Sequence, residues 1–265
     1  MKCTTIITVA NNKGGVGKTT TVAAISSKMA SRGYKVLMID LDSQCSLTEC
    51  FLDELPEPSI YDAFLNPRQD WSEAVIEINE NLSIFPSSKL LDELDMMLAA
   101  KTQKESFLAR MLKNMNVQSK YDYIVLDCSP SINLCTINAL VATDYLLVPT
   151  IPEIMPLKGL KKLEQKIEEI VEELNPELQI DGIIVTQHNM SKNLHNMAVR
   201  ALKEIYPDTV FNTKIRENIK LAEAPRLKQS IFEYAPESNG AKDYSELTEE
   251  ILKLMNEEEN EATDA

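Results

Sequence analysis

The fold is decided by the stretch Asn11-Asn12-Lys13-Gly14-Gly15-Val16-Gly17-Lys18-Thr19-Thr20, which follows the apolar run Ile6-Ile7-Thr8-Val9 and precedes a segment with helical spacing. In a strand, glycine-rich loop and helix taken in that order, successive backbone N–H groups curl around a phosphate, and the positive end of the helix favours the bound anion. We therefore interpret the stretch as a phosphate-binding loop for a nucleotide. The alternative, a glycine-rich turn without a ligand, would have no need of two lysines.

The residue types within this loop suggest individual roles. Lys18 would reach the outer phosphates, and the Thr19 hydroxyl would coordinate a Mg²⁺ ion that bridges them. The strict pattern G-x-x-x-x-G-K-[ST] fails, because Asn12 stands where it requires glycine, and a second lysine, Lys13, precedes the glycines instead. The expected nucleotide contacts from the loop are Lys13, Gly14, Gly15, Val16, Gly17, Lys18, Thr19 and Thr20.

Two further apolar runs end in carboxylates. The run at 36–39 leads into Asp40 and Asp42, and the segment 121–126, which is apolar from residue 123 on, leads into Asp127 and a turn at 128–131. Unbroken apolar runs are typical of strands buried on both faces of a parallel sheet, and ligands bind beyond the carboxyl ends of such strands. We expect these acids to meet the phosphates and the metal, with Asp127 holding Mg²⁺ through its water shell in a Walker B pattern.

The rest of the chain alternates between strand and helix patterns. Strands are expected at 82–85, 145–148 and 180–185, and helices at 60–65, 107–115, 157–174 and 194–206. This alternation predicts an α/β fold in which a mostly parallel, twisted sheet carries helices on both faces. We expect a single P-loop domain over residues 1–256, followed by an acidic, disordered tail over residues 257–265.

Composition narrows the cellular context. The chain has 265 residues and no apolar run near the roughly 18 residues that a membrane span needs, so we expect a cytoplasmic protein. Its five cysteines are odd in number and lack C-x-x-C spacing, which favours reduced thiols. A zinc or iron–sulfur site would need more soft ligands, and the chain has only two histidines.

The loop sequence Lys-Gly-Gly-Val-Gly-Lys-Thr, with its second lysine, resembles the deviant Walker A motif of the ParA and MinD class of ATPases. The segment Asp40-Leu41-Asp42-Ser43-Gln44 is similar to the family's Asp-x-Asp-Pro-Gln, with serine in place of proline, and residues 214–225 and 238–244 resemble C-terminal segments of partition ATPases. The resemblance covers residues 4–255. It implies ATP and Mg²⁺ as cofactors and hydrolysis of ATP to ADP and phosphate as the activity.

The resemblance also implies roles for single residues. Asp42 would orient the attacking water and Asp40 would support the metal shell, so the expected catalytic residues are Lys13, Lys18 and Asp42 and the expected metal ligands are Thr19, Asp40 and Asp127. Lys13 would act across a dimer interface. Loops near two strand ends would enclose the adenine, which adds the expected ATP contacts Thr186, Gln187, Ile215, Arg216 and Asn218.

Charge is unevenly distributed along the chain. The net charge is −14, yet residues 188–228 hold eight Lys/Arg and four Asp/Glu, a local charge of +4 that leaves −18 on the remainder. A basic region on an acidic body is a candidate nucleic-acid footprint, although an ordinary solvated surface is the commoner origin of such an imbalance. With the resemblance, the expected DNA-binding residues are Lys192, Arg216, Lys220, Arg226 and Lys228.

The resemblance implies a ParA/Soj-type ATPase that partitions plasmids or chromosomes. ATP would close a sandwich homodimer, the dimer would bind non-specific double-stranded DNA on the nucleoid, and a ParB-like centromere-binding protein would stimulate hydrolysis and release. A MinD-like membrane ATPase is the first alternative, but it needs a basic amphipathic C-terminal helix and residues 257–261 are acidic, so we expect no membrane partner. A reductase resembling nitrogenase iron protein is the second, and it would need cluster-ligating cysteines, for which Cys128 and Cys135 are the nearest pair.

Overall fold

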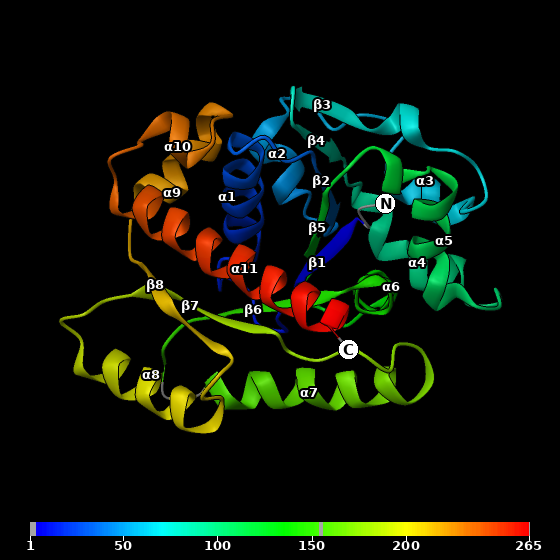
Figure 1. The fold of residues 1–265 in the computed structure, drawn as a ribbon. Coiled ribbons are helices and arrows are strands. Elements are labelled where there is room, and N and C mark those ends of the chain that lie inside the picture. Colours follow the sequence, from blue (N-terminus) through cyan, green and yellow to red (C-terminus); the bar gives the residue numbers. More distant parts are fainter. Residues whose placement is uncertain (1–3, 154–155, 265) are drawn as a thin grey trace.

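The computed structural model describes residues 4–153 and 156–264. Its described strands form one eight-stranded sheet in the order β3-β4-β2-β5-β1-β6-β7-β8 (Figure 1). All neighbouring strands are parallel except β3 and β4. The strands are β1 (Thr5–Val9), β2 (Val36–Leu41), β3 (Ile76–Asn79), β4 (Leu82–Phe85), β5 (Tyr123–Cys128), β6 (Tyr145–Thr150), β7 (Gly182–His188) and β8 (Val210–Arg216). The predicted α/β class with a mostly parallel sheet is confirmed.

Helices cover both faces of the sheet and bury two hydrophobic cores (Figure 1). One core is closed by α1 (Lys18–Ser31), α2 (Ser46–Phe51), α9 (Lys220–Glu223), α10 (Ile231–Tyr234) and α11 (Asn239–Asp264). The other lies under α3 (Ile60–Leu65), α4 (Leu94–Met97), α5 (Phe107–Asn114), α6 (Leu134–Ala142), α7 (Pro156–Glu173) and α8 (Asn193–Ile205). Short 3₁₀ turns connect several of these elements.

Strand β2 explains why apolar runs in the sequence form the centre of the sheet. All six of its residues are buried, and they alternate between the two cores: Val36 and Met38 join the core under α1, whereas Leu37 and Ile39 join the opposite one. Burial of each such side chain stabilises the fold by roughly 1.5–3 kcal/mol. A strand buried on both faces favours an unbroken apolar run, as the sequence predicted for residues 36–39, and the buried Asp40 near its end is the exception.

The register of the three central strands determines where the functional residues meet. Val9 at the end of β1 pairs with Asp127 on β5, and Asp127 pairs in turn with Asp40 on β2. The carboxyl ends of β1, β5 and β2 are therefore adjacent. They deliver the phosphate-binding loop and both acidic segments to one edge of the sheet, where open α/β folds bind ligands.

One strand at the edge of the sheet differs from the expectations. Strand β3 pairs antiparallel with β4 at the sheet edge and was not predicted, because its exposed Glu77 and Asn79 interrupt the apolar pattern. The disordered tail expected over residues 257–265 stays a prediction, and α11 is described as far as Asp264. Among the α11 residues whose burial is described, the last buried apolar side chain is Met255, and the glutamates and alanine that follow in the sequence are good helix formers. Within the described residues, no helix is both long and apolar enough to cross a bilayer.

Candidate functional site

The loop between β1 and α1 has the backbone of a phosphate cradle. Gly15 and Gly17 have φ angles of +72° and +87°, in the left-handed region that favours glycine. Gly17 is the N-cap of α1, so the first N–H groups of that 14-residue helix point into the loop. Lys18 is the first residue of the helix, and Thr19 follows it. This geometry is that of an anion site at a helix N-terminus.

The carboxyl end of β7 braces this loop. The Thr186 hydroxyl donates a hydrogen bond to the carbonyl of Val16 at 2.8 Å, and the Gln187 side-chain amide donates to the carbonyl of Gly15 at 2.7 Å. Thr186 is only 2% exposed and supports the loop through this bond, and its expected contact with adenine stays a prediction. Gln187 has a φ of +50°, an uncommon conformation for a residue with a side chain, and lines the cavity in front of the loop.

Asp127 has the environment of a metal ligand. It is fully buried, its Oδ2 accepts a hydrogen bond from the Thr19 hydroxyl at 2.7 Å, and its Oδ1 has no hydrogen-bond partner among the described residues. Burial raises the pKa of Asp127 well above its usual range, the charge of Asp40 adds to that rise, and Thr19 and Lys18 oppose it. A buried carboxylate oxygen without a donor is costly unless a cation pairs with it. The residues present therefore fit Mg²⁺, which takes one or two protein oxygens and completes its shell with water and phosphate oxygens.

Lys18 is placed to serve the phosphates. Its side chain is buried, and burial lowers its pKa while the charge of Asp127 raises it. The ammonium donates to the carbonyl of Lys13 at 3.4 Å, a long hydrogen bond. A desolvated ammonium with so weak a partner interacts strongly with any anion that enters the loop.

A closed ring of hydrogen bonds holds the segment after β2. The Asp42 N–H donates to Asp40 Oδ1 at 3.1 Å, and the N–H and hydroxyl of Thr48 both donate to Asp40 Oδ2 at 2.8 Å. The Ser87 N–H donates to the Thr48 hydroxyl at 2.9 Å, and the Ser87 hydroxyl donates to the Asp42 carbonyl at 2.6 Å. The pKa of Asp40 is raised to about 6 by burial, against the opposing effect of the Thr48 bonds. Asp40 and Ser87 thus hold the backbone of Asp42, and Thr48 links these two residues to each other.

The cavity in front of the loop has a volume of about 710 Å³, within the range of ligand sites. Most of the loop residues and Asp42 line this cavity. Sequence reasoning missed the lining residues Gln44, Ser46, Glu49, Cys50, Pro130 and Pro225. The first four follow Asp42 directly in the chain, which was the available signal. Arg226 and Lys228, expected to contact DNA, also line this cavity, and the Lys228 ammonium donates to the carbonyl of Glu49 at 2.6 Å.

The adenine contacts expected on and after β8 stay predictions, and their side chains contact other parts of the same chain. Ile215 is buried in the core, and Asn218 accepts a hydrogen bond from the backbone N–H of Lys220 at 2.9 Å. The guanidinium of Arg216 binds the carboxylate of Asp243, with Nε 3.1 and 3.0 Å from the two oxygens. None of Ile215, Arg216 and Asn218 lines the cavity.

Several cations that the sequence marked as functional are paired with carboxylates of the same chain. Lys192 is 2.7 Å from Glu217, and Lys220 is 2.9 Å from Glu223. Both pairs are about half exposed, whereas Asp243, the partner of Arg216, has a side chain only 6% exposed. Three of the eight cations in residues 188–228 are therefore neutralised by carboxylates of the same chain.

Lys13 does not line the cavity in front of the loop to which it belongs, which we call the nucleotide cavity. Its ammonium lies 2.5 Å from a carboxylate oxygen of Glu153, and both side chains are about half exposed. The backbone N–H of Lys13 donates to the side-chain oxygen of Asn11 at 3.0 Å, and the Asn11 side-chain amide donates to the carbonyl of Pro149 at 2.7 Å. Asn11 thus fixes the backbone ahead of the glycines while the Lys13 side chain extends outward.

The four cysteines within the described residues form no disulfide with one another. Cys45, Cys50, Cys128 and Cys135 are free, and burial raises the pKa of Cys50 and of Cys135 to about 12. Within residues 4–153 and 156–264, no three His, Cys, Asp or Glu side chains are grouped so that they could hold a metal ion by themselves. A Mg²⁺ ion in the nucleotide cavity would therefore depend on phosphate and water oxygens as well as on Thr19 and Asp127.

Comparison with known proteins assigns the chain to a family and identifies relatives of similar length. The fold and the loop are those of a P-loop nucleotide-binding protein, and the family model AAA_31, an AAA domain, matches residues 4–180. The chain belongs to this family and is homologous to the sporulation initiation inhibitor protein Soj of Bacillus subtilis, with 34% identity over 248 residues that cover 93% of this chain and 97% of Soj.

Solved structures of other proteins have the same fold over nearly the whole chain. A putative plasmid partition protein of Borrelia burgdorferi bound to AMPPNP has a TM-score of 0.76 at 27% identity and covers 97% of this chain and all of its own. Cobyrinic acid a,c-diamide synthase of Mycobacterium smegmatis, bound to an ATP analogue and magnesium, has a TM-score of 0.82 at 26% identity, with 96% of each chain covered. One fold thus serves proteins with different names, and function must be argued from the site.

Proposed function

We propose that this protein is a Mg²⁺-dependent ATPase of the ParA type, which hydrolyses ATP to ADP and phosphate and forms a sandwich homodimer when ATP is bound. The observation that carries the proposal is the buried, unpartnered Oδ1 of Asp127 beside the Thr19 hydroxyl, at the head of the helix that follows the glycine loop. The homology to Soj and the likeness to a partition protein with bound AMPPNP support the same assignment.

In this proposal the loop and two side chains bind the nucleotide. Backbone N–H groups of residues 14–17 cradle the phosphates, the Lys18 ammonium binds the outer ones, and Thr19 and Asp127 hold the metal. Mg²⁺, when bound, neutralises negative charge on the β- and γ-phosphates. Phosphoryl transfer depends mostly on positioning and charge neutralisation, and these residues provide both.

Asp42 orients the attacking water in this mechanism. Its carboxylate lines the cavity, and one of its oxygens accepts a hydrogen bond from the Gln44 N–H at 3.0 Å. Its backbone is held by Asp40 and Ser87, which Thr48 links to each other. We therefore assign Asp40 to the positioning of Asp42, in place of the expected role in the metal shell, because donors of Asp42 and Thr48 already engage both of its oxygens.

Lys13 acts on the nucleotide of the partner subunit. It points away from its own cavity, and its exposed ion pair with Glu153 is worth only about 0–1 kcal/mol. Exchange of that carboxylate for phosphates of a second bound nucleotide therefore costs little. Two nucleotides buried between subunits concentrate negative charge, which a lysine from each partner would offset.

The ATP-bound dimer binds non-specific double-stranded DNA on the nucleoid, and a ParB-like protein stimulates hydrolysis and release. We restrict the DNA-contacting residues to Lys192 and Lys220, because their exposed carboxylate partners can be exchanged for DNA phosphates at little cost. Arg216 is held by a buried carboxylate, and Arg226 and Lys228 face the nucleotide cavity.

The test is ATP turnover with and without Mg²⁺. Asp127→Asn should abolish Mg²⁺-dependent hydrolysis, because the amide cannot supply the anionic oxygen that the metal site offers. The matched control is Asp92→Asn, which removes an exposed carboxylate near α4 and should leave turnover unchanged. If the parent protein does not hydrolyse ATP, or if Asp127→Asn hydrolyses it with the same Mg²⁺ dependence, the proposed function is wrong.

A further inference from the structure

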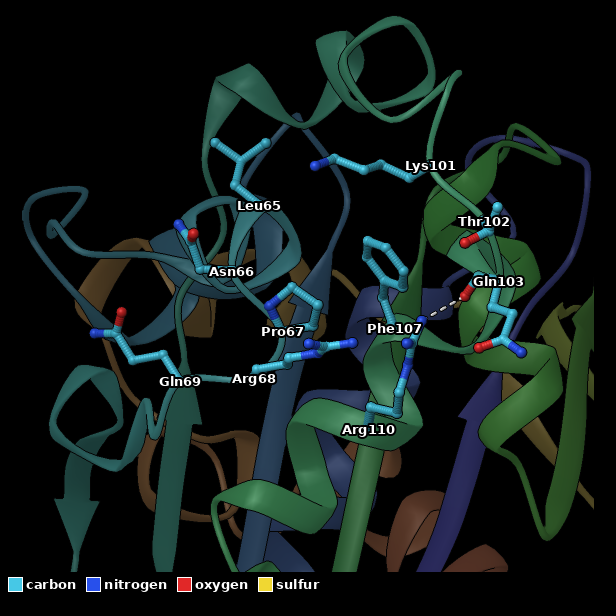
Figure 2. A pocket seen from close by; sticks show the side chains of 10 residues that line it. All are labelled: Leu65, Asn66, Pro67, Arg68, Gln69, Lys101, Thr102, Gln103, Phe107 and Arg110. Carbon is cyan, nitrogen blue, oxygen red and sulfur yellow. Dashed lines mark hydrogen bonds between the residues drawn. The ribbon is translucent and has the colours of Figure 1, made fainter.

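A second hollow, which we call the basic pocket, lies between the C-terminal end of α3, the loop that precedes α5, and α5 itself (Figure 2). Its volume is about 610 Å³, and it shares no lining residue with the nucleotide cavity. In Figure 1, α3 and α5 lie on the side of the molecule that holds β3, β4 and β2, whereas α8 and α9 lie on the opposite side, near β8. Lys192 is the N-cap of α8 and Lys220 is the first residue of α9. The basic pocket therefore belongs neither to the nucleotide site nor to the proposed DNA surface.

The lining of the basic pocket is cationic. Arg68, Lys101 and Arg110 line it together with three side-chain amides and no carboxylate, in a chain that has 41 Asp and Glu against 27 Lys and Arg. Within the described part of the chain, none of these three cations forms an ion pair, whereas Lys192 and Lys220 each do. Three unpaired cations around one hollow are mutually repulsive until an anion enters.

One of the cations is held in place. The Arg110 guanidinium lies 4.6 Å from the ring centroid of Phe107, and its Nη2 donates to the carbonyl of Gln103 at 2.6 Å. Figure 2 shows the Arg68 side chain extending toward Arg110, the Arg110 side chain running to Gln103, and the Lys101 side chain reaching across the hollow from the loop that precedes α5. A preorganised guanidinium loses little freedom when it binds a carboxylate.

The loop that carries Lys101 and Gln103 is also supported from below. The Asn138 side-chain amide on α6 donates to the carbonyl of Lys104 at 2.9 Å, and its oxygen accepts from the N–H of Leu108 at 3.0 Å. Asn138 is fully buried. The pocket wall is therefore fixed before any ligand arrives.

We propose that the basic pocket binds an acidic peptide segment of a partner protein. Cations on separate walls match carboxylates spaced along a chain better than they match one compact anion, and the amides of Asn66, Gln69 and Gln103 can bond a peptide backbone. A nucleotide or single-stranded nucleic acid would need an aromatic face on which to stack a base. The one aromatic ring that lines the pocket, Phe107, is 6% exposed and has Arg110 on its face.

The experiment measures binding of a fluorescein-labelled hexapeptide of sequence GEEGEE by fluorescence anisotropy at low salt. The parent protein should bind it and should not bind the neutral analogue GQQGQQ. The double variant Arg68→Gln/Lys101→Gln should bind the acidic peptide at least tenfold more weakly. Both side chains are exposed, so a thermal melt should show an unchanged fold. The matched control, Lys113→Gln/Lys161→Gln, removes two exposed cations outside the pocket and should bind like the parent.

Other outcomes overturn the proposal. Absence of peptide binding by the parent, equal binding by the Arg68/Lys101 double variant, or equal loss in the control variant would each exclude an acidic-peptide site here. Competition separates the remaining anions: if inorganic phosphate or random duplex DNA displaces the peptide at concentrations equal to or below that of unlabelled GEEGEE, the pocket is a phosphate site or a nucleic-acid site instead. Nucleotide is absent from these assays, so their outcome is independent of ATP hydrolysis.

Discussion

Replacement of Thr48 by valine breaks the hydrogen-bonded ring that holds Asp42. The Thr48 hydroxyl is fully buried, donates to Asp40 and accepts from the Ser87 N–H. Valine keeps nearly the same shape but loses both bonds. One bond to a charged group contributes about 1.5–3 kcal/mol and one neutral bond about 0.5–1.5 kcal/mol, so we expect the free energy of unfolding to fall by roughly 2–4 kcal/mol.

The same variant should slow catalysis more than it weakens nucleotide binding. The phosphate loop, Lys18 and Asp127 do not contact Thr48, whereas the backbone of Asp42 depends on the ring that includes Thr48 and Ser87. We expect kcat for ATP to fall about tenfold, which corresponds to about 1.4 kcal/mol, while ATP affinity changes less than about threefold.

Urea unfolding and steady-state ATP turnover measure the two effects separately. Thr48→Ser is the matched control, because it keeps the hydroxyl and should retain most of the turnover. If Thr48→Val hydrolyses ATP as fast as the parent while it is destabilised, the ring supports the fold alone and Asp42 is positioned by other contacts. If neither stability nor turnover changes, the hydrogen bonds themselves contribute nothing measurable.

Three further predictions concern titration and charge. The folded pKa of Asp40 is about 6, against 3.8 for an unperturbed carboxyl, so the folded state keeps this proton to a higher pH than the unfolded state. The free energy of unfolding should therefore fall by roughly 3 kcal/mol between about pH 4 and pH 6, measured by urea unfolding relative to Asp40→Asn. A free energy of unfolding that rises across this window relative to that variant would contradict the assignment. Lys192→Gln/Lys220→Gln should weaken ATP-dependent binding of random duplex DNA and flatten its salt dependence, whereas the control Lys113→Gln/Lys161→Gln should bind like the parent. If the Lys192/Lys220 variant binds DNA as tightly as the parent across a salt series, the DNA surface lies elsewhere. Arg216→Gln should leave DNA binding intact but lower the free energy of unfolding by about 1–3 kcal/mol, because it removes the partner of the buried Asp243 carboxylate. A calorimetric Tm equal to that of the parent would show that this ion pair does not stabilise the fold.

The sequence was sufficient where function depends on a short segment. Apolar runs ending in Asp40 and Asp127 predicted two buried strands, and the register of β2 with β5 pairs these two residues directly. The glycine-rich loop predicted a tight turn, and Gly15 and Gly17 indeed have the positive φ angles that glycine adopts more readily than other residues. Local pattern and tertiary structure agree at these positions because sheet geometry leaves few alternatives.

The sequence was insufficient where a residue depends on a distant partner. Thr48 and Ser87 carry no motif, and their bond joins positions 39 residues apart. The charge count at 188–228 could not show that Asp243, 27 residues beyond Arg216, takes that arginine out of any basic surface. It also could not show that Lys228 turns toward Glu49, 179 residues away in the chain. Net charge along a sequence does not specify which face a side chain occupies.

The molar mass of Asp42→Ala in the presence of Mg²⁺ and ATP, measured by light scattering after size exclusion, tests the central claim most directly. Without its water-orienting carboxylate the protein should bind ATP and not hydrolyse it, so it should elute as a dimer at twice the 29.8 kDa of one chain and as a monomer with ADP. Addition of Lys13→Ala to this variant should return it to a monomer with ATP. A monomer of Asp42→Ala under all conditions, or a dimer that persists without Lys13, would contradict an ATP-closed dimer joined by Lys13 across the interface.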